Sequence, residues 1–277
     1  MSFPIRRNFS RHARAFRAAD AYVVSIQKAG RTWVRVFLEA YFDAWRQAGG
    51  AQDRPAPPTL HYTHDLWEFY EKVPRYERLR GKWLIPPGDA RRKLKLLVAR
   101  DPRDVMVSLY FHLTKRSRRF EGDISALLRD PQLGVAQIVG IMNRWLREWR
   151  GPRLHILRYE DARHNPRTAF AAAIRFLLPA AEPDPVALAQ AIELSSFENM
   201  HRLEAHSADA KGSLIVARAG LDKDALRPAD AADANSFKTR RGKVGGYVDY
   251  LNAEDIAFLH AEVAKLDPRY GYGGRRS

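Results

Sequence analysis

Short apolar runs alternate with apolar stripes of helical spacing in the first half of this chain. Two runs, at 22–26 and 94–99, predict buried strands. Each is followed by a turn and then by apolar positions three and four residues apart, over 34–45 after the first run and over 105–113 after the second. The pattern therefore predicts the order strand, turn, helix at two places.

The same alternation continues toward the C-terminus. It predicts a short strand at 59–63 that leads to His64, a helix at 135–149, a strand at 154–157, and helices at 165–178, 185–194 and 252–266. Strands that alternate with helices predict an α/β fold with a mainly parallel central sheet flanked by helices. We expect a single domain over 1–277, because the chain is long enough for one large core and has no internal repeat.

Two stretches have no firm periodicity. Residues 65–92 are mixed, and prolines there interrupt any long element. Residues 205–236 are polar and rich in alanine, aspartate and glycine, which is typical of a mobile substrate loop or of a disordered segment. We expect a mobile loop.

The composition is that of a globular protein, with 45% hydrophobic and 11% aromatic residues. The absence of cysteine excludes disulfides, thiolate metal sites and a cysteine nucleophile. No run approaches the roughly 18–20 apolar residues of a membrane span. The N-terminus lacks the apolar stretch of a secretory signal. We therefore expect a cytoplasmic protein.

The chain is strongly basic, with a formal net charge of +15. Such a charge attracts polyanions, which include nucleic acids, anionic lipid head groups and multiply charged cofactors. The basic run at 115–119 has no interleaved aromatic residues, so we expect no specific nucleic-acid site. The arginine-rich arm at 1–20 is interpreted as solvated, with peripheral contact to an anionic membrane as the alternative.

The turn after the first strand has the residues of an anion site. Lys28 supplies a full positive charge, and Gly30 lets an anion approach the backbone closely. The helix that follows directs its free N–H groups and its positive end at the same place. The spacing differs from G-x-x-x-x-G-K-[ST], so the turn is P-loop-like rather than a P-loop. Taken alone, these residues also fit an ordinary turn with a solvated lysine.

The second strand leads to a comparable turn. Arg100 stands at the carboxyl end of the strand, and Ser108 lies two turns into the next helix. Asp101 suits the N-cap, Pro102 suits the first helical position, and Asp104 suits a capping carboxylate. Because the carboxyl ends of parallel strands meet at one edge of a sheet, we expect the two turns to form one site.

Three short motifs carry a family resemblance: KAGRTW at 28–33, RDPRDVMVS at 100–108 and RRGKVGGY at 240–247. They resemble the 5'-phosphosulfate loop K-S-G-T-T-W, the 3'-phosphate motif R-x-P-x-D-x-x-x-S and the C-terminal motif R-K-G-x-x-G-D-W of sulfotransferases. These enzymes use 3'-phosphoadenosine-5'-phosphosulfate (PAPS). The motifs occur in the family's order, and the similarity spans about 21–266.

The resemblance implies an enzyme that moves a sulfuryl group from PAPS to an acceptor hydroxyl. Charge grows on the bridging oxygen of the leaving nucleotide, where Lys28 is placed to stabilise it. The implied residues of the 5'-phosphosulfate loop are Lys28, Ala29, Gly30, Arg31, Thr32 and Trp33. Ala29 and Arg31 replace the family's Ser and Thr, which removes two hydroxyls and adds one charge. The family's transfer needs no metal, and we expect none.

The remaining donor contacts follow from the same resemblance. The implied residues for the 3'-phosphate are Arg100, Ser108, Arg240, Arg241 and Gly242. The implied residues for adenine are Trp33, Tyr159, Ser195, Phe197 and Met200. Gly246 and Tyr247 replace the usual Asp-Trp at the end of the C-terminal motif.

The acceptor hydroxyl must lose a proton as it bonds to sulfur, and a neutral histidine can take that proton. His64 lies between the two donor motifs. Family members with a Thr-His pair at this place use the histidine as the base, which favours His64. His61 and His112 are the alternatives.

Two other functions stay open from the sequence. A nucleotide kinase-like phosphate-transfer enzyme would need a P-loop and carboxylates for Mg²⁺. A basic protein that binds nucleic acid or an anionic surface would leave the ordered motifs unexplained. The aromatic residues of 49–92 suit a small-molecule phenol, a sugar ring or a lipid as acceptor, and the positive charge favours an anionic or membrane-presented glycan or glycolipid. The oligomeric state is not indicated.

Overall fold

The computed structural model describes residues 15–48, 54–64, 91–149, 151–205, 233, 237 and 239–273. The described residues leave out most of the N-terminal arm at 1–20, most of 65–92 and most of 205–236. The predicted behaviour of these segments therefore stays a prediction. The single-domain organisation of 1–277 stays a prediction.

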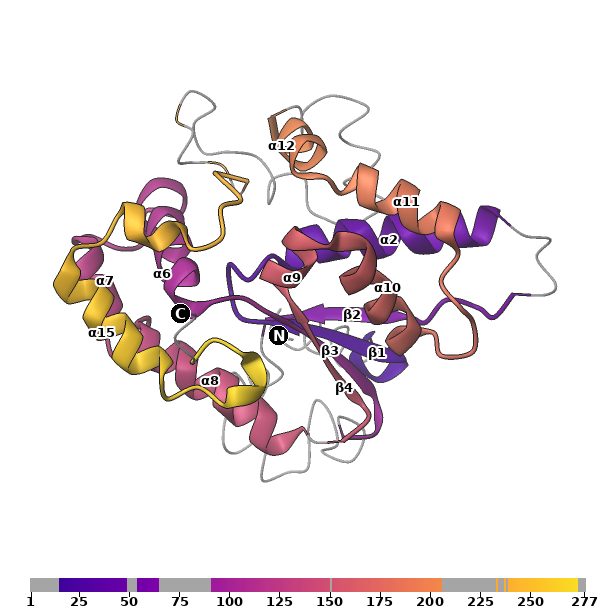
Figure 1. The fold of residues 1–277 in the computed structure, drawn as a ribbon, viewed down its shortest axis with the longest axis horizontal. Coiled ribbons are helices and arrows are strands. Elements are labelled where there is room, and N and C mark those ends of the chain that lie inside the picture. Colours follow the sequence, from indigo (N-terminus) through magenta and orange to yellow (C-terminus); the bar gives the residue numbers. More distant parts are fainter. Residues whose placement is uncertain are drawn as a thin grey trace, which may run out of the picture.

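The described part is built on four parallel strands in the order β2-β1-β3-β4 (Figure 1). These are β1 (Ala21–Ser25), β2 (Leu60–Thr63), β3 (Leu94–Ala99) and β4 (Leu154–Arg158). In the register, Val24 pairs with Thr63 on one side and with Leu97 on the other. The predicted α/β fold with a parallel central sheet is confirmed.

One face of the sheet is covered by α2 (Arg31–Gln47), α10 (Pro166–Leu177) and α11 (Pro185–Leu194) (Figure 1). Val23 and Leu96 direct their side chains into this layer, where α2 contributes a large aromatic surface. The aromatic rings of Phe37 and Phe170 stack there with centroids 3.8 Å apart.

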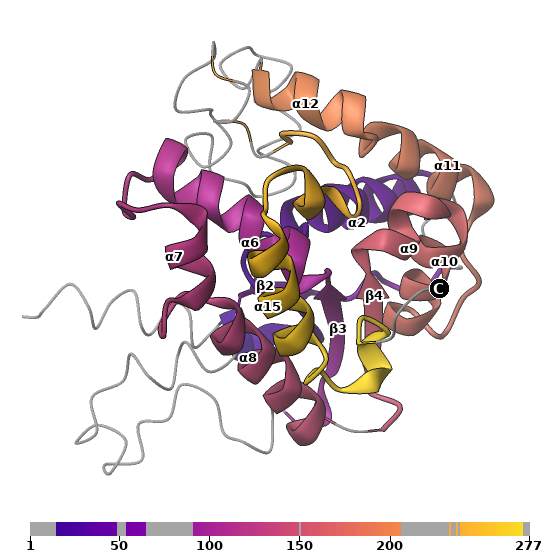
Figure 2. The ribbon, with the colours of Figure 1, turned by 60° about the vertical axis from the view of Figure 1, so that its left-hand side comes forward.

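The opposite face is covered by α6 (Pro102–Phe111), α7 (Ile124–Arg129), α8 (Val135–Glu148) and α15 (Ala253–Val263). Tyr22, Val24 and Leu97 point into this second core. Both ribbon views place these four helices on one side and α2, α10 and α11 on the other (Figures 1 and 2). Because neighbouring residues of a buried strand face opposite layers, the continuous apolar runs of the sequence are explained.

Capping residues set most helix starts where the sequence predicts them. Asp101 accepts a hydrogen bond from Arg103 N and Asn252 accepts one from Asp255 N, while Pro102 opens α6. The helix predicted at 185–194 has these bounds in the structure. The last helix ends at Val263 rather than at 266.

Other elements depart from the prediction. The chain leaves β4 directly into a short helix, α9 (Tyr159–His164), and α6 continues into a π-helical turn (His112–Arg116). A further helix, α12 (Phe197–Ala205), follows α11, and the 240–247 motif ends in a 3₁₀ turn (Gly246–Asp249). All of these lie near the carboxyl edge of the sheet, where the candidate site forms.

Candidate functional site

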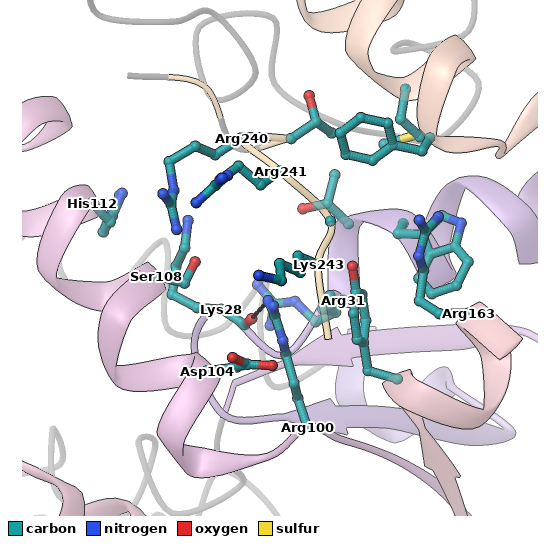
Figure 3. A pocket seen from close by; sticks show the side chains of 18 of the residues that line it. Lys28, Arg31, Arg100, Asp104, Ser108, His112, Arg163, Arg240, Arg241 and Lys243 are labelled. Atoms are coloured by element: carbon teal, nitrogen blue, oxygen red, sulfur yellow. Dashed lines mark hydrogen bonds between the residues drawn. The ribbon is translucent and has the colours of Figure 1, made fainter. Parts of the chain in front are cut away.

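A cavity of about 310 Å³ opens beyond the carboxyl ends of β1 and β3. All three motifs line it (Figure 3). The turn that holds His64 and the start of α9 line it as well. The predicted site residues that line it are Lys28, Gly30, Arg31, Thr32, Trp33, His64, Arg100, Ser108, Tyr159, Phe197, Met200, Arg240, Arg241 and Gly242.

The turn between β1 and α2 presents a concentration of donors to this cavity. The first backbone hydrogen bond of α2 runs from Val34 N to Gly30 O at 3.1 Å, so the N–H groups of residues 31–33 have no acceptor within the helix. No acidic residue occupies the first turn of α2. Lys28, at the rim of this turn, also lines the cavity. The turn therefore has the geometry of an oxyanion site.

Position 30 requires glycine for two reasons, its backbone conformation and the close packing of a neighbouring ring. It has a φ of 96°, and a Cβ at this position would lie 2.9 Å from Cδ2 of Tyr159. The missing side chain thus lets the aromatic ring of Tyr159 close over the turn.

The two strand–turn–helix units meet as the sequence predicts. Arg100 donates from Nη1 to the carbonyl oxygen of Lys28 at 3.3 Å, and its guanidinium lies 4.3 Å from the centre of the Tyr159 ring. Because β1 and β3 are hydrogen-bonded neighbours, the residues that follow them lie within reach of one ligand.

Asp104 has a role that the sequence did not indicate. The α6 N-cap is Asp101, whereas the Asp104 carboxylate accepts hydrogen bonds from Gly245 N at 2.8 Å and Tyr247 N at 3.0 Å. Burial raises the pKa of Asp104, while the charge of Arg100 and the two N–H groups oppose that rise. Asp104 thereby joins the second motif to the third.

The third motif brings two cations to the side of the cavity where Ser108 lies (Figure 3). The guanidinium of Arg240 lies 4.2 Å from the centre of the Phe111 ring and donates to the hydroxyl of Tyr250. Arg241 donates to the same hydroxyl at 2.9 Å. Arg240, Arg241 and Ser108 together offer several donors to one anionic group.

A buried carboxylate anchors the start of this motif. Glu204, at the end of α12, accepts from Thr239 N at 2.9 Å and from Thr239 Oγ1 at 2.8 Å. Arg116, from the π-helical turn, pairs with the same carboxylate at 3.2 Å. The Glu204 side chain is only 2% exposed, so these contacts are shielded from water.

Aromatic rings form a wall beside the donor turn. Trp33 and Tyr159 meet edge to face with centroids 5.3 Å apart. The indole Nε1 of Trp33 donates to the carbonyl oxygen of Ser195 at 2.7 Å, which fixes the ring. Phe197 and Met200 continue this wall from α12. A flat apolar ring can enter between such groups.

Two predicted site residues do not line the cavity. Ala29 is fully buried in the core, because its side chain points away from the turn. Ser195 caps the C-terminus of α11, and its hydroxyl donates to Ala191 O at 2.7 Å. Its backbone carbonyl, rather than its side chain, contacts Trp33 of the site.

The three candidate bases are separated by the structure. Nε2 of His64 lies 2.7 Å from Nη2 of Arg31. His112 also lines the cavity. His61 does not line it, and its ring packs against Phe16 at a centroid distance of 5.1 Å.

The electrostatic character of the cavity is cationic. Its lining includes Lys28, Arg31, Arg100, Arg163, Arg240, Arg241 and Lys243. Among the described residues, the lining carboxylates are Asp104 and Glu204, and both are occupied by the donors given above. The cavity can therefore compensate several negative charges on one ligand. Lys243 belongs to the third motif, whereas no sequence motif indicated Arg163.

Within the part of the chain that the structure describes, no group of three histidine or acidic side chains is placed to hold a metal ion. The same part contains no helix whose length and apolar character would let it cross a bilayer.

Comparison with known proteins identifies the family. The sequence pattern of the sulfotransferase domain matches residues 18–266. Cytosolic sulfotransferase 16 of Arabidopsis thaliana is 25% identical over 264 residues, which cover 87% of this chain and 74% of the relative. Cytosolic sulfotransferase 15 of the same plant is 24% identical over 285 residues, with 92% and 73% coverage.

Solved structures show the same fold. The crystal structure of mouse sulfotransferase SULT7A1 complexed with PAP superposes with a TM-score of 0.58 at 15% identity, over 94% of this chain and 86% of that chain. Retinol dehydratase in complex with androsterone and inactive cofactor PAP gives a TM-score of 0.58 at 14% identity, with 93% and 84% coverage. The resemblance drawn from the three motifs is confirmed: the chain belongs to the sulfotransferase domain family.

Proposed function

We propose that this protein transfers a sulfuryl group from PAPS to an acceptor hydroxyl. The observation that carries the proposal is the convergence of all three motifs on one cationic cavity, with Arg100 bonded to the backbone of Lys28. Two structurally similar proteins were solved with PAP, the product nucleotide of such a transfer.

We propose one orientation for the donor in the cavity. Its 5'-phosphosulfate is held by the N–H groups at the start of α2 and by Lys28. Its 3'-phosphate meets the residues implied for it, which all line the cavity: Arg100, Ser108, Arg240, Arg241 and Gly242. The adenine enters the aromatic wall of Trp33 and Tyr159. This arrangement supplies cations to both anionic ends of the ligand.

The transfer step requires charge stabilisation and removal of one proton. The acceptor oxygen bonds to sulfur as the bond from sulfur to the bridging oxygen breaks, and Lys28 stabilises the charge that develops on the bridging oxygen. His64 takes the hydroxyl proton. His112 is the second candidate base, because it also lines the cavity.

We propose a small molecule as the acceptor. Val36, Met200 and Leu203 add apolar surface to the cavity, which suits an apolar body next to the reacting hydroxyl. Retinol dehydratase was solved with androsterone and with retinol, which are small molecules with large apolar bodies. An anionic glycan or glycolipid, favoured by the net charge, is the alternative. We propose a cytoplasmic location, as in the names of the two plant relatives, with peripheral contact to an anionic membrane as an added proposal.

Calorimetry with the purified protein tests the donor site. We expect PAP to bind, and ATP with Mg²⁺ to bind much more weakly because it lacks the 3'-phosphate. Radiolabelled PAPS offered with a panel of phenols, steroid alcohols, glycans and glycolipids then identifies the acceptor. Tight binding of ATP–Mg²⁺ without PAP binding would replace the proposal by a kinase-like function, and salt-sensitive DNA binding alone would replace it by a nucleic-acid function.

A further inference from the structure

Arg31 is hydrogen-bonded to the nitrogen atom at which His64, the candidate base, would accept a proton. Its Nη2 lies 2.7 Å from Nε2 of His64, and both side chains line the cavity. The guanidinium has donors only and keeps its proton at any ordinary pH, so the lone pair of Nε2 must be the acceptor. His64 in this arrangement is therefore a neutral imidazole with its proton on Nδ1.

A base in this condition cannot take a proton at Nε2. The lone pair that would receive the hydroxyl proton is already used by Arg31. The hydrogen bond to Arg31 has to break before a hydroxyl can take its place, and a group that binds Arg31 more strongly would favour that exchange.

An oxyanion is such a group, and the fold places one beside Arg31. Arg31 is the first residue of α2, and the N–H groups of residues 31–33 at that helix end have no acceptor within the helix. A phosphate or sulfate held there lies at the base of the Arg31 side chain. A guanidinium binds a charged oxyanion through two parallel, charge-assisted hydrogen bonds, which are stronger than one bond to a neutral imidazole.

We infer that Arg31 couples donor binding to the release of the base, an inference that rests on the proposed function. The oxyanion of the 5'-phosphosulfate takes the guanidinium from His64, and Nε2 then accepts the proton of the acceptor hydroxyl. The acceptor oxygen forms its bond to sulfur, the bond from sulfur to the bridging oxygen breaks, and PAP carries away that electron pair. Arg31 is thus a positioning residue toward His64 and a contact residue toward the donor.

Nitrogen NMR of protein labelled with [¹⁵N]histidine tests this directly, with His64→Asn used to assign the signal. In the free protein, Nε2 of His64 should show the shift of a nitrogen that accepts a strong hydrogen bond. PAP and PAPS should each move this signal. Adenosine 3'-phosphate, which lacks the 5'-oxyanion, should bind and leave it unchanged.

Arg31→Thr supplies the matched variant, since it restores the residue type of the family motif. Its His64 signal should already resemble that of the PAP-bound wild type before any ligand is added. Its affinity for PAP should fall about tenfold or more, as expected when the charge-assisted hydrogen bonds from the guanidinium to the oxyanion are lost, while its affinity for adenosine 3'-phosphate should not change. Arg163→Thr is the control, because Arg163 lines the same cavity but packs over Phe197 and should leave the His64 response intact.

The outcomes distinguish a failure of the proposed function from a failure of the inference about Arg31. If the protein does not bind PAP, the proposed function itself is wrong. If PAP and PAPS bind and neither moves the His64 signal, the function stands and this inference is overturned. A small anionic phenol, 4-hydroxybenzoate, serves as a probe for the acceptor. If it moves the His64 signal in the absence of donor and PAP does not, an anionic acceptor rather than the donor releases His64, and this inference is overturned.

Discussion

Lys28 is held in a backbone conformation that side chains rarely adopt. Its φ is 65°, in the left-handed region. Such a residue costs about 1–2 kcal/mol relative to glycine, and the flanking strand β1 and helix α2 keep it in place. A lysine that is retained at this cost is consistent with a use for its charge, and the cavity it lines provides one.

Lys28→Ala is expected to lower turnover about a hundred- to a thousandfold, the usual effect of removing one group that stabilises transition-state charge. The dissociation constant of PAP should change less than about tenfold, because other groups hold the ground-state nucleotide. Single-turnover transfer and calorimetry measure the two quantities. Lys28→Gly is the matched control: it should lose turnover equally, yet unfold at a higher denaturant concentration than Lys28→Ala, since glycine tolerates the left-handed backbone. Equal losses of affinity and turnover would contradict the assigned role.

Gly30→Ala should damage both stability and the adenine wall. The new Cβ would meet the Tyr159 ring at 2.9 Å in a residue with a φ of 96°. Gly151→Ala isolates the backbone cost, because Gly151 has a φ of 86° and a methyl group added there would point into open space. We expect Gly151→Ala to lose about 1–2 kcal/mol of unfolding free energy with PAP affinity unchanged, and Gly30→Ala to lose more and to bind PAP poorly. Denaturant unfolding measures the loss of stability, and calorimetry measures the affinity for PAP. If the two variants lost the same stability and affinity, the packing of the Tyr159 ring would not depend on Gly30.

Single residues of the site were predictable from sequence only where a local motif carries them. Lys28 and Gly30 belong to a strand–turn–helix pattern that can be read from neighbouring residues. Asp104 could not be assigned, because the N–H groups it binds lie 141 and 143 residues further along the chain. The contact of Ser195 with the site could not be predicted either, since it is the backbone carbonyl of Ser195 that holds Trp33, 162 residues away in the chain.

At the scale of elements, two buried carboxylates fix the third motif at both ends. Glu204 of α12 holds Thr239, and Asp104 of α6 holds Gly245 and Tyr247. Between these anchors the motif bends at Gly242, where a Cβ would lie 2.8 Å from the Phe197 ring. The position of the motif is therefore set by helices that are remote from it in sequence.

Glu204→Ala should release the start of this motif. Arg116 would lose this buried ion pair and Thr239 would lose its acceptor, so the unfolding free energy should fall by about 3–5 kcal/mol. PAP affinity should fall about tenfold or more if the 3'-phosphate contacts are displaced, while 5'-AMP, which has no 3'-phosphate, should bind as before. Glu182→Ala removes the carboxylate of an exposed pair with Arg175 and should change neither measurement by more than about 1 kcal/mol. A parallel loss of PAP and 5'-AMP binding would mean that Glu204 supports the whole fold rather than this subsite.

Most of the helices and strands could be predicted from the sequence, because apolar periodicity and capping residues are local signals. The parallel order of β1 and β3 follows from the helices that separate the strands in sequence. The elements that escaped prediction include the π-helical turn (His112–Arg116) and α9, which lie at the edge of the cavity. Their form depends on packing against segments distant in sequence, which periodicity does not report.

At the scale of the whole molecule, positive charge is concentrated at the carboxyl edge of the sheet but not confined to it. The opposite end of β3 carries Lys95, which is only 2% exposed, near Arg153. Its Nζ donates to the carbonyl oxygen of Lys93 at 2.7 Å. The net charge of +15 therefore reflects structural constraints as well as the cationic cavity.

The buried lysine makes stability depend on pH in a defined range. Burial, and secondarily the charge of Arg153, lowers the pKa of Lys95 to about 8, below its ordinary value of 10.5. Between these two values the unfolded chain binds a proton at this residue that the folded protein does not, so the contribution of Lys95 to the unfolding free energy rises from pH 8 to pH 10.5. In Lys95→Met this slope should vanish, and the difference between wild type and variant should grow in favour of the wild type across that range. Urea unfolding of both proteins at several pH values measures it, with the other titrating groups cancelling in the difference. If the difference in unfolding free energy between the two proteins did not change with pH, it would report only packing and the lost hydrogen bonds of Nζ. Lys95 would then keep its proton in the folded protein.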